Sequence, residues 1–272
     1  MSRLKSRFDA LKTAGRKALI PFVTAGDPQP QITVPLMHEL VKAGADVLEL
    51  GIPFSDPMAE GPAIQRACER ALMHHITLTN VLDMVRQFRE TDSDTPVVLM
   101  GYLNPIEAMG YETFAEHAVA AGADGVITVD LPPEEADDYL AAFNRHGLDP
   151  VFLLAPTSTP ERIRRVAEVA GGFVYYVSLK GVTGASNLDP VEVEAKLAEI
   201  RKQVSLPLGV GFGIKSPEIA AAVANVADAV VVGSALVNRI AELADTPEEI
   251  LKTVPAFVAS LRDAMDQVEV NA

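Results

Sequence analysis

The chain has 272 residues, is 49% hydrophobic and carries a formal net charge of −14 at pH 7. This hydrophobic content is ample for a globular core, and the length fits one large α/β barrel or two small domains. The negative charge argues against nucleic acids and anionic membranes as partners. Cys68 is the single cysteine, which excludes an internal disulfide and a cysteine-based metal cluster. No apolar run approaches the roughly 18–20 residues of a membrane span.

The first segment of the chain has the basic residues of a targeting peptide but not its other features. Asp9 interrupts the basic run, and no apolar region or small-residue cleavage site follows. Leu4, Phe8 and Leu11 recur at helical spacing. We therefore predict a short N-terminal helix that covers the floor of a barrel, in a soluble cytoplasmic protein.

Eight short apolar runs follow, each separated from the next by a helical pattern. They lie at residues 19–23, 46–50, 97–100, 125–129, 151–154, 173–177, 208–211 and 229–232. Runs rich in branched residues that alternate with helices indicate parallel strands joined by right-handed crossovers. Eight such units predict an α/β protein with a single (β/α)₈ TIM barrel domain over residues 1–272 and an extra N-terminal helix. A doubly wound open sheet is the alternative.

One carboxylate stands at the end of an otherwise apolar run. Glu49 lies in the second expected strand, where a buried acid is costly unless it is paired, neutralised or used. The carboxyl ends of parallel strands are also where α/β folds place their chemistry. The loop that follows adds Asp56 and Glu60. These acids predict an enzyme centred on a carboxylate acid/base.

The last three expected strands end in loops that contain glycine, at residues 180–185, 211–214 and 233–235. Glycine lets backbone amides approach an anion closely, and barrels commonly hold phosphate after strands seven and eight. A phosphate site is favoured, although tight turns alone would also explain these glycines. Nucleotide-binding patterns are missing, and the five histidines show no metal-ligand spacing, so we expect no metal.

Longer motifs resemble the alpha subunit of tryptophan synthase over nearly the whole chain. The matching segments are residues 21–28, 48–57, 61–62 with 64–65, 101–102 with 104–105, 130–132, 181–184 and 211–214. The second of these, LELGIPFSDP, is long and very specific. The resemblance implies a barrel lyase that cleaves indole-3-glycerol phosphate into indole and glyceraldehyde 3-phosphate, for L-tryptophan biosynthesis. It implies no cofactor in this chain, and a pyridoxal-phosphate-bearing beta subunit as partner in an α2β2 heterotetramer.

The resemblance also implies catalytic roles. Glu49 would protonate the indole ring carbon and then accept a hydroxyl proton from the glycerol chain. A second carboxylate would bind the indole N–H, and Glu60 stands where the family typically has aspartate. We expect Glu60 to keep the role, although one extra methylene moves its carboxylate by about 1.5 Å. The alternative for Glu60 is a surface carboxylate on a flexible loop.

Other residues match family positions that contact substrate. The expected substrate-binding residues are Phe22, Ile64, Tyr175, Thr183, Gly184, Phe212, Gly213, Gly233 and Ser234. Thr183 matches a residue of a loop that closes over the site, and Asp56 matches a residue tied to that closure and to the beta subunit. Two other functions stay open at this point: another phosphate-binding barrel isomerase or synthase, and a catalytically silent activator of the beta subunit.

Overall fold

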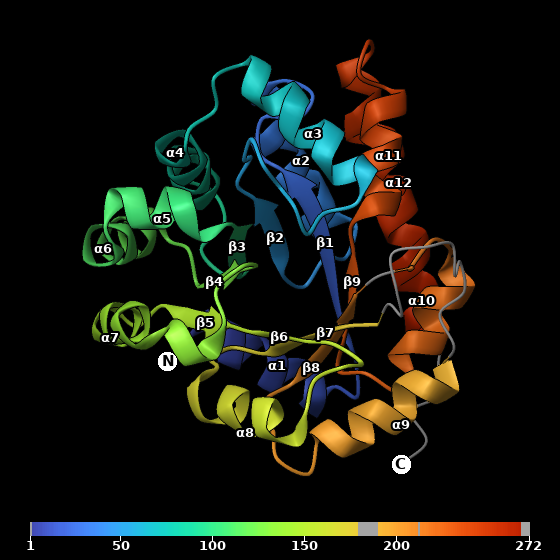
Figure 1. The fold of residues 1–272 in the computed structure, drawn as a ribbon. Helices are drawn as coiled ribbons and strands as arrows, with labels where there is room; N and C mark the ends of the chain where they lie inside the picture. Colours follow the sequence, from blue (N-terminus) through green and yellow to red (C-terminus); the bar gives the residue numbers. More distant parts are fainter. Residues whose placement is uncertain (1, 179–189, 212, 268–272) are drawn as a thin grey trace.

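The structure, a computed structural model, describes residues 2–178, 190–211 and 213–267. Within this part of the chain, short parallel strands alternate with helices (Figure 1). The strands are β1 (Ala18–Thr24), β2 (Leu48–Gly51), β3 (Val97–Gly101), β4 (Gly125–Thr128), β5 (Asp149–Val151), β6 (Leu153–Leu154), β7 (Val174–Val177), β8 (Leu208–Gly211) and β9 (Ala229–Val232).

Helices connect these strands. They are α1 (Arg3–Thr13), α2 (Pro30–Lys42), α3 (Pro62–Met73), α4 (Leu78–Arg89), α5 (Leu103–Met109), α6 (Tyr111–Ala121), the short 3₁₀ helix η1 (Pro133–Glu135), α7 (Asp137–His146), α8 (Pro160–Val169), α9 (Pro190–Ile200), α10 (Pro217–Ala224), α11 (Ser234–Glu242) and α12 (Pro247–Asp266). In the described part of the chain, no helix is long and apolar enough to cross a bilayer.

The strands close into a barrel. Their order is β5-β4-β3-β2-β1-β9-β8-β7-β6, and every neighbouring pair is parallel. The two outer strands, β5 and β6, are consecutive in the chain and separated only by Phe152. They therefore form one interrupted fifth strand that pairs with β4 on one side and β7 on the other. The predicted (β/α)₈ barrel is confirmed, and the open-sheet alternative is wrong.

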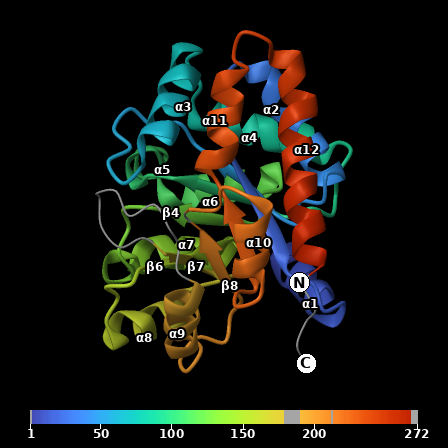
Figure 2. The same ribbon diagram turned by 90° about the vertical axis from the view of Figure 1, so that its right-hand side faces the viewer.

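The barrel has an inner and an outer apolar layer. Along β1, Ala18 and Ile20 belong to the inner cluster, whereas Leu19 and Val23 pack with the helices outside. This is the alternation expected of strands in a small barrel whose interior is filled by side chains. Figures 1 and 2 show the helices around the outside of the strands, with α4 to α7 on one side and α10 to α12 on the other.

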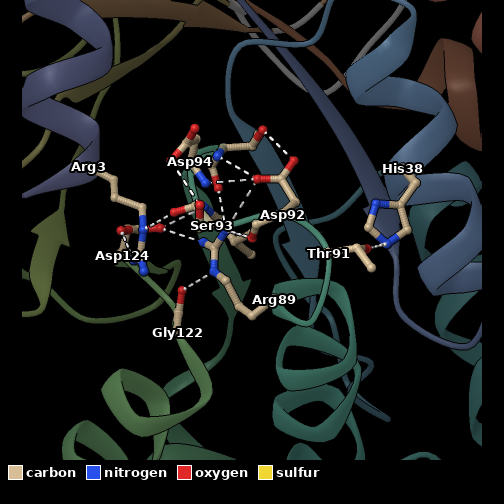
Figure 3. Close-up of polar contacts among 11 residues, drawn as sticks. Arg3, His38, Arg89, Thr91, Asp92, Ser93, Asp94, Gly122 and Asp124 are labelled. Atoms are coloured by element: carbon tan, nitrogen blue, oxygen red, sulfur yellow. Dashed lines mark hydrogen bonds and ion pairs between the residues drawn. The ribbon is translucent and has the colours of Figure 1, made fainter.

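Helix α1 closes the amino-terminal end of the barrel, which we call the floor. Leu4, Phe8 and Leu11 are buried in the inner cluster, as predicted. Arg3 at the start of α1 binds the Asp124 carboxylate at 2.9 Å, and Arg89 from α4 binds the other oxygen at 2.9 Å (Figure 3). The prediction of an N-terminal helix on the floor is confirmed.

Aspartates on the floor follow a repeated pattern. Asp46, Asp124 and Asp228 precede β2, β4 and β9, and each accepts the backbone N–H of a residue in the neighbouring strand and a bond from an arginine. The partners are, in that order, Leu19 and Arg262, Val97 and Arg89, and Leu208 and Arg201. Strand β2 begins at Leu48, two residues later than predicted.

The single-domain assignment over residues 1–272 stays a prediction. Residues 1, 179–189, 212 and 268–272 lie outside the described residues.

Candidate active site

A cavity of about 910 Å³ opens at the carboxyl-terminal end of the strands, which we call the mouth. It is lined from several strands and from the loops that follow them, as expected for a barrel enzyme. Its lining includes these predicted site residues: Phe22, Glu49, Glu60, Ile64, Tyr175, Gly213, Gly233 and Ser234. The structure therefore gathers in one place residues that lie more than 200 positions apart in the chain.

Glu49 projects into the cavity from β2. Its residue is 1% exposed, and its Oε2 atom has no hydrogen-bond partner among the described residues. Burial, and to a smaller extent the charge of Glu60, raises the pKa of Glu49 to about 8. The Glu49 side chain is therefore a neutral acid at pH 7, able to give a proton to a group in the cavity.

Glu60 lies in the loop between β2 and α3 and is half-buried. Burial raises the pKa of Glu60 to about 7. Burial thus raises the pKa of both carboxyl groups, and the charge of Glu60 raises that of Glu49 further. Carboxyl groups whose pKa values lie near neutral pH are typical of acid/base sites.

Two aromatic rings form walls of the cavity because glycines make room for them. A Cβ atom at Gly51 would lie 2.6 Å from Cζ of Phe22, and one at Gly211 would lie 1.9 Å from the hydroxyl of Tyr175. Any larger residue at either position would displace the ring. Burial raises the pKa of Tyr175 well above its ordinary value, so its hydroxyl stays protonated.

The part of the lining beside these rings is suited to an anion. Gly213 has a φ of +79°, and Gly233 caps the N-terminus of α11, whose first residue is Ser234. A helix N-terminus and glycine amides attract phosphate. Lys215 also lines this wall, is exposed, and has no ion-pair partner among the described residues. Sequence reasoning missed Lys215, whose only signal was a basic residue two positions after Gly213.

Several apolar lining residues were also missed. Met100, Val129 and Leu153 face the cavity from the ends of β3, β4 and β6. Strand alternation could have found them, because residues at the carboxyl end of a barrel strand that point inward must line the mouth. They make the site largely apolar around the two carboxyl groups.

Asp56 lies away from the cavity. It is exposed on the loop after β2, and its Oδ2 accepts a hydrogen bond from Ser55 Oγ at 2.6 Å. Thr183, Gly184 and Phe212 lie outside the described residues. No cluster of three or more potential metal ligands occurs in residues 2–178, 190–211 and 213–267.

Together, the barrel fold, the two carboxyl groups at its mouth and the glycine-bearing wall define a (β/α)₈ barrel with a candidate site for carboxylate acid/base chemistry. A family model described as "Tryptophan synthase alpha chain" matches residues 8–266. The tryptophan synthase alpha chain of Thioalkalivibrio sulfidiphilus is 64% identical over 98% of this chain and 100% of its own length. That of Methylococcus capsulatus is 59% identical, with the same coverage.

A solved structure agrees with these relatives. The alpha subunit of tryptophan synthase from Legionella pneumophila superposes with a TM-score of 0.92 at 53% identity, covering 98% of this chain and 100% of that one. The chain belongs to the tryptophan synthase alpha chain family.

Membership of this family sets the reaction. The chain is a lyase of tryptophan biosynthesis that cleaves indole-3-glycerol phosphate into indole and glyceraldehyde 3-phosphate, as the resemblance implied. In this family pyridoxal phosphate belongs to the beta subunit, so no cofactor is expected in this chain. The alternative of another phosphate-binding barrel enzyme is thereby wrong.

Proposed function

We propose that Glu49 is the general acid and base of the lyase reaction and that Glu60 stabilises the charge that develops on the indole ring. The observation that carries this proposal is the buried Glu49 carboxyl, whose Oε2 has no hydrogen-bond partner among the described residues, in the wall of a 910 Å³ cavity that Glu60 also lines. A silent activator would have no need to keep such an acid there, because burying a polar group without a hydrogen bond costs free energy of folding.

Cleavage of the bond between indole C3 and the glycerol chain is a retro-aldol reaction. Glu49 is protonated at neutral pH and gives its proton to C3, which makes indole a neutral leaving group. The resulting carboxylate then accepts the proton of the chain hydroxyl as the aldehyde forms. The same side chain thus returns to its starting state without a second acid.

Protonation of C3 puts positive charge on the indole ring, and that charge reaches the ring nitrogen. Glu60, with the lower pKa of the two acids, is the anion that accepts a hydrogen bond from the indole N–H. The charge is stabilised where it develops, in a site with apolar walls where electrostatic interactions are strong.

The substrate would contact both the aromatic walls and the glycine-bearing wall. Phe22, Ile64 and Tyr175 contact the indole ring, and the phosphate binds at Gly213, Gly233 and Ser234 with Lys215 beside it. The cavity lining supports these assignments. Thr183, Gly184 and Phe212 are proposed as further contacts on the strength of the resemblance alone.

We also propose a beta subunit as partner, in an α2β2 heterotetramer, with Asp56 at the loop that responds to it. The exposure of Asp56 is compatible with this role. A cytoplasmic location is proposed because a phosphorylated substrate is charged and does not cross membranes freely.

The test is indole release from indole-3-glycerol phosphate by the purified chain, with and without a beta subunit. Glu49→Gln should reduce release by about 10²–10⁴-fold in both conditions. Glu116→Gln, at an exposed position on α6, is the matched control and should leave the rate unchanged. Wild-type rates in Glu49→Gln would refute the assignment.

A further inference from the structure

The loop segment that carries Glu60 is bonded by two side chains from outside it. The backbone N–H of Ala59 donates to the hydroxyl of Tyr102 at 3.0 Å. The side-chain amide of Gln65 donates to the backbone carbonyl of Glu60 at 2.8 Å. These two hydrogen bonds hold the peptide units on either side of the Ala59–Glu60 pair, one before Ala59 and one after Glu60.

Both side chains come from ordered surroundings. Tyr102 is 4% exposed and is the residue between β3 and α5. Its ring stacks on Phe54, with centroids 5.3 Å apart and an angle of 25° between the ring planes. Gln65 lies in the first turn of α3. The loop is therefore tied to the helix that follows it, through Gln65, and to the junction of β3 and α5, through Tyr102.

Neither Tyr102 nor Gln65 lines the cavity in the described part of the chain, whereas Ala59 and Glu60 do. Their side chains bond the backbone that places the Glu60 carboxylate. They act on the backbone and not on the substrate. Placement matters here, because a displacement of about 1 Å at a reacting group can cost about 10²-fold in rate.

We propose that Tyr102 and Gln65 are positioning residues for the lyase reaction, which fix the Glu60 carboxylate in the cavity by clamping the peptide units that flank it. This inference rests on the proposed role of Glu60. We call the pair of hydrogen bonds the peptide clamp. Without it, the loop between β2 and α3 would keep its place in the chain, but the Glu60 carboxylate would sample positions away from the indole nitrogen.

The experiment measures kcat and KM for indole release in the full chain, with Tyr102→Phe and Gln65→Met each made in two backgrounds, wild type and Glu60→Gln. Each variant removes one clamp bond while keeping most of the side-chain volume, so a second variant remains if one fails to fold. Tyr139→Phe is the matched control, since it removes a buried hydroxyl that bonds Thr128 at 2.9 Å.

In the wild-type background we expect kcat to fall about three- to tenfold for each clamp variant, with KM changed less than twofold. The reason is that the variant loses the placement of the Glu60 carboxylate and not the binding of substrate. In the Glu60→Gln background the clamp variants should cause no further fall. Tyr139→Phe should keep wild-type kcat and KM.

Two results would overturn the peptide clamp: wild-type kcat in both clamp variants, or the same fold-loss in both backgrounds, which would place their effect elsewhere. If Glu60→Gln itself has wild-type kcat, then the proposed function of Glu60 fails first, and the clamp with it.

Discussion

Asp46 and Glu49 stand three residues apart around the same strand, yet one belongs to the floor of the barrel and the other to its mouth. Both are buried, at 5% and 1% exposure. Asp46 accepts a hydrogen bond from the Leu19 N–H at 2.9 Å and forms an ion pair with Arg262 at 3.1 Å. Glu49 has an oxygen with no partner among the described residues.

The electrostatic balance differs in the same way. Burial raises the pKa of Asp46, but the Leu19 N–H and the charge of Arg262 oppose that rise. Burial and the neighbouring Glu60 both raise the pKa of Glu49, and no group in the described part of the chain opposes them. The floor thus uses its carboxylate to join elements, whereas the mouth keeps a carboxyl group that is poised to exchange a proton.

The largest expected effect is seen when Asp46 and Glu49 are substituted separately and the stability and kcat of the two variants are compared. Asp46→Ala removes two hydrogen bonds to a buried carboxylate, from the Leu19 N–H and from Arg262, although Arg262 keeps Asp266 and the Lys17 carbonyl as partners. Because a hydrogen bond to a charged group contributes about 1.5–3 kcal/mol, the substitution should lower the free energy of unfolding by about 3–5 kcal/mol. Its kcat at a temperature where it stays folded should equal that of wild type. Urea unfolding and indole release measure the two quantities.

Glu49→Gln should show the opposite result, with kcat lost and no loss of stability. If Asp46→Ala instead loses activity while folded, the floor is not separate from the chemistry. If Glu49→Gln unfolds the chain, its carboxyl has a structural role that the cavity does not reveal.

The second effect is on the pH dependence of stability. The pKa of Glu49 is about 8 in the folded chain, above its ordinary value of 4.5. The folded state therefore holds this proton longer than the unfolded state, and its contribution to stability is lost as pH rises from about 4.5 to 8. Each unit of pKa difference corresponds to about 1.4 kcal/mol.

Glu49→Gln cannot lose that proton. The free energy of unfolding of Glu49→Gln relative to wild type should therefore increase between pH 5 and pH 9 by several kcal/mol. Urea unfolding at four or five pH values tests this. Parallel curves for the two proteins across that range would contradict a raised pKa of Glu49.

The third effect concerns the pH dependence of the reaction. The pKa of Glu60 is about 7 and that of Glu49 about 8, and the productive form has Glu60 ionised and Glu49 protonated. Because kcat/KM reports the pKa values of the free enzyme, kcat/KM should peak near pH 7–8. Glu60→Gln should remove the acidic limb and keep the basic one. A kcat/KM profile that rises monotonically to pH 10 would contradict the assigned protonation of Glu49.

The smallest effect is at the anion-binding wall of the mouth. Lys215→Met should raise KM by about two- to fivefold at low salt, because an exposed charge pair contributes up to about 1 kcal/mol. The difference from wild type should shrink in 0.5 M salt, where the Debye length falls to a few Å. Lys202→Met, at an exposed position after α9, is the control and should leave KM unchanged.

Much of the fold could be read from apolar runs. Glu49 could be predicted as a site residue directly, because an acid inside an apolar run would be buried and a buried acid requires an explanation. The interruption of the fifth strand at Phe152 was not foreseen, since the run of residues 151–154 is continuous in composition. Pairing in a barrel depends on neighbours on both sides, which a single run does not encode.

The site was predicted as a set of residues but not as a geometry. The bond from Ala59 to Tyr102 joins positions 43 residues apart, and no local pattern indicates it. Lys215 was overlooked because a lysine in a loop is usually a solvated surface residue. Contacts across loops become visible only once the strands bring their ends to one edge.

A direct titration of the Glu49 side chain is the decisive measurement. In protein labelled with ¹³C at the glutamate carboxyl carbons, the resonance that disappears in Glu49→Gln identifies this residue. We expect it to titrate with a midpoint near 8, as burial without a partner requires. A midpoint near 4.5 would mean that Glu49 is ionised at neutral pH and has no proton to give to the indole ring.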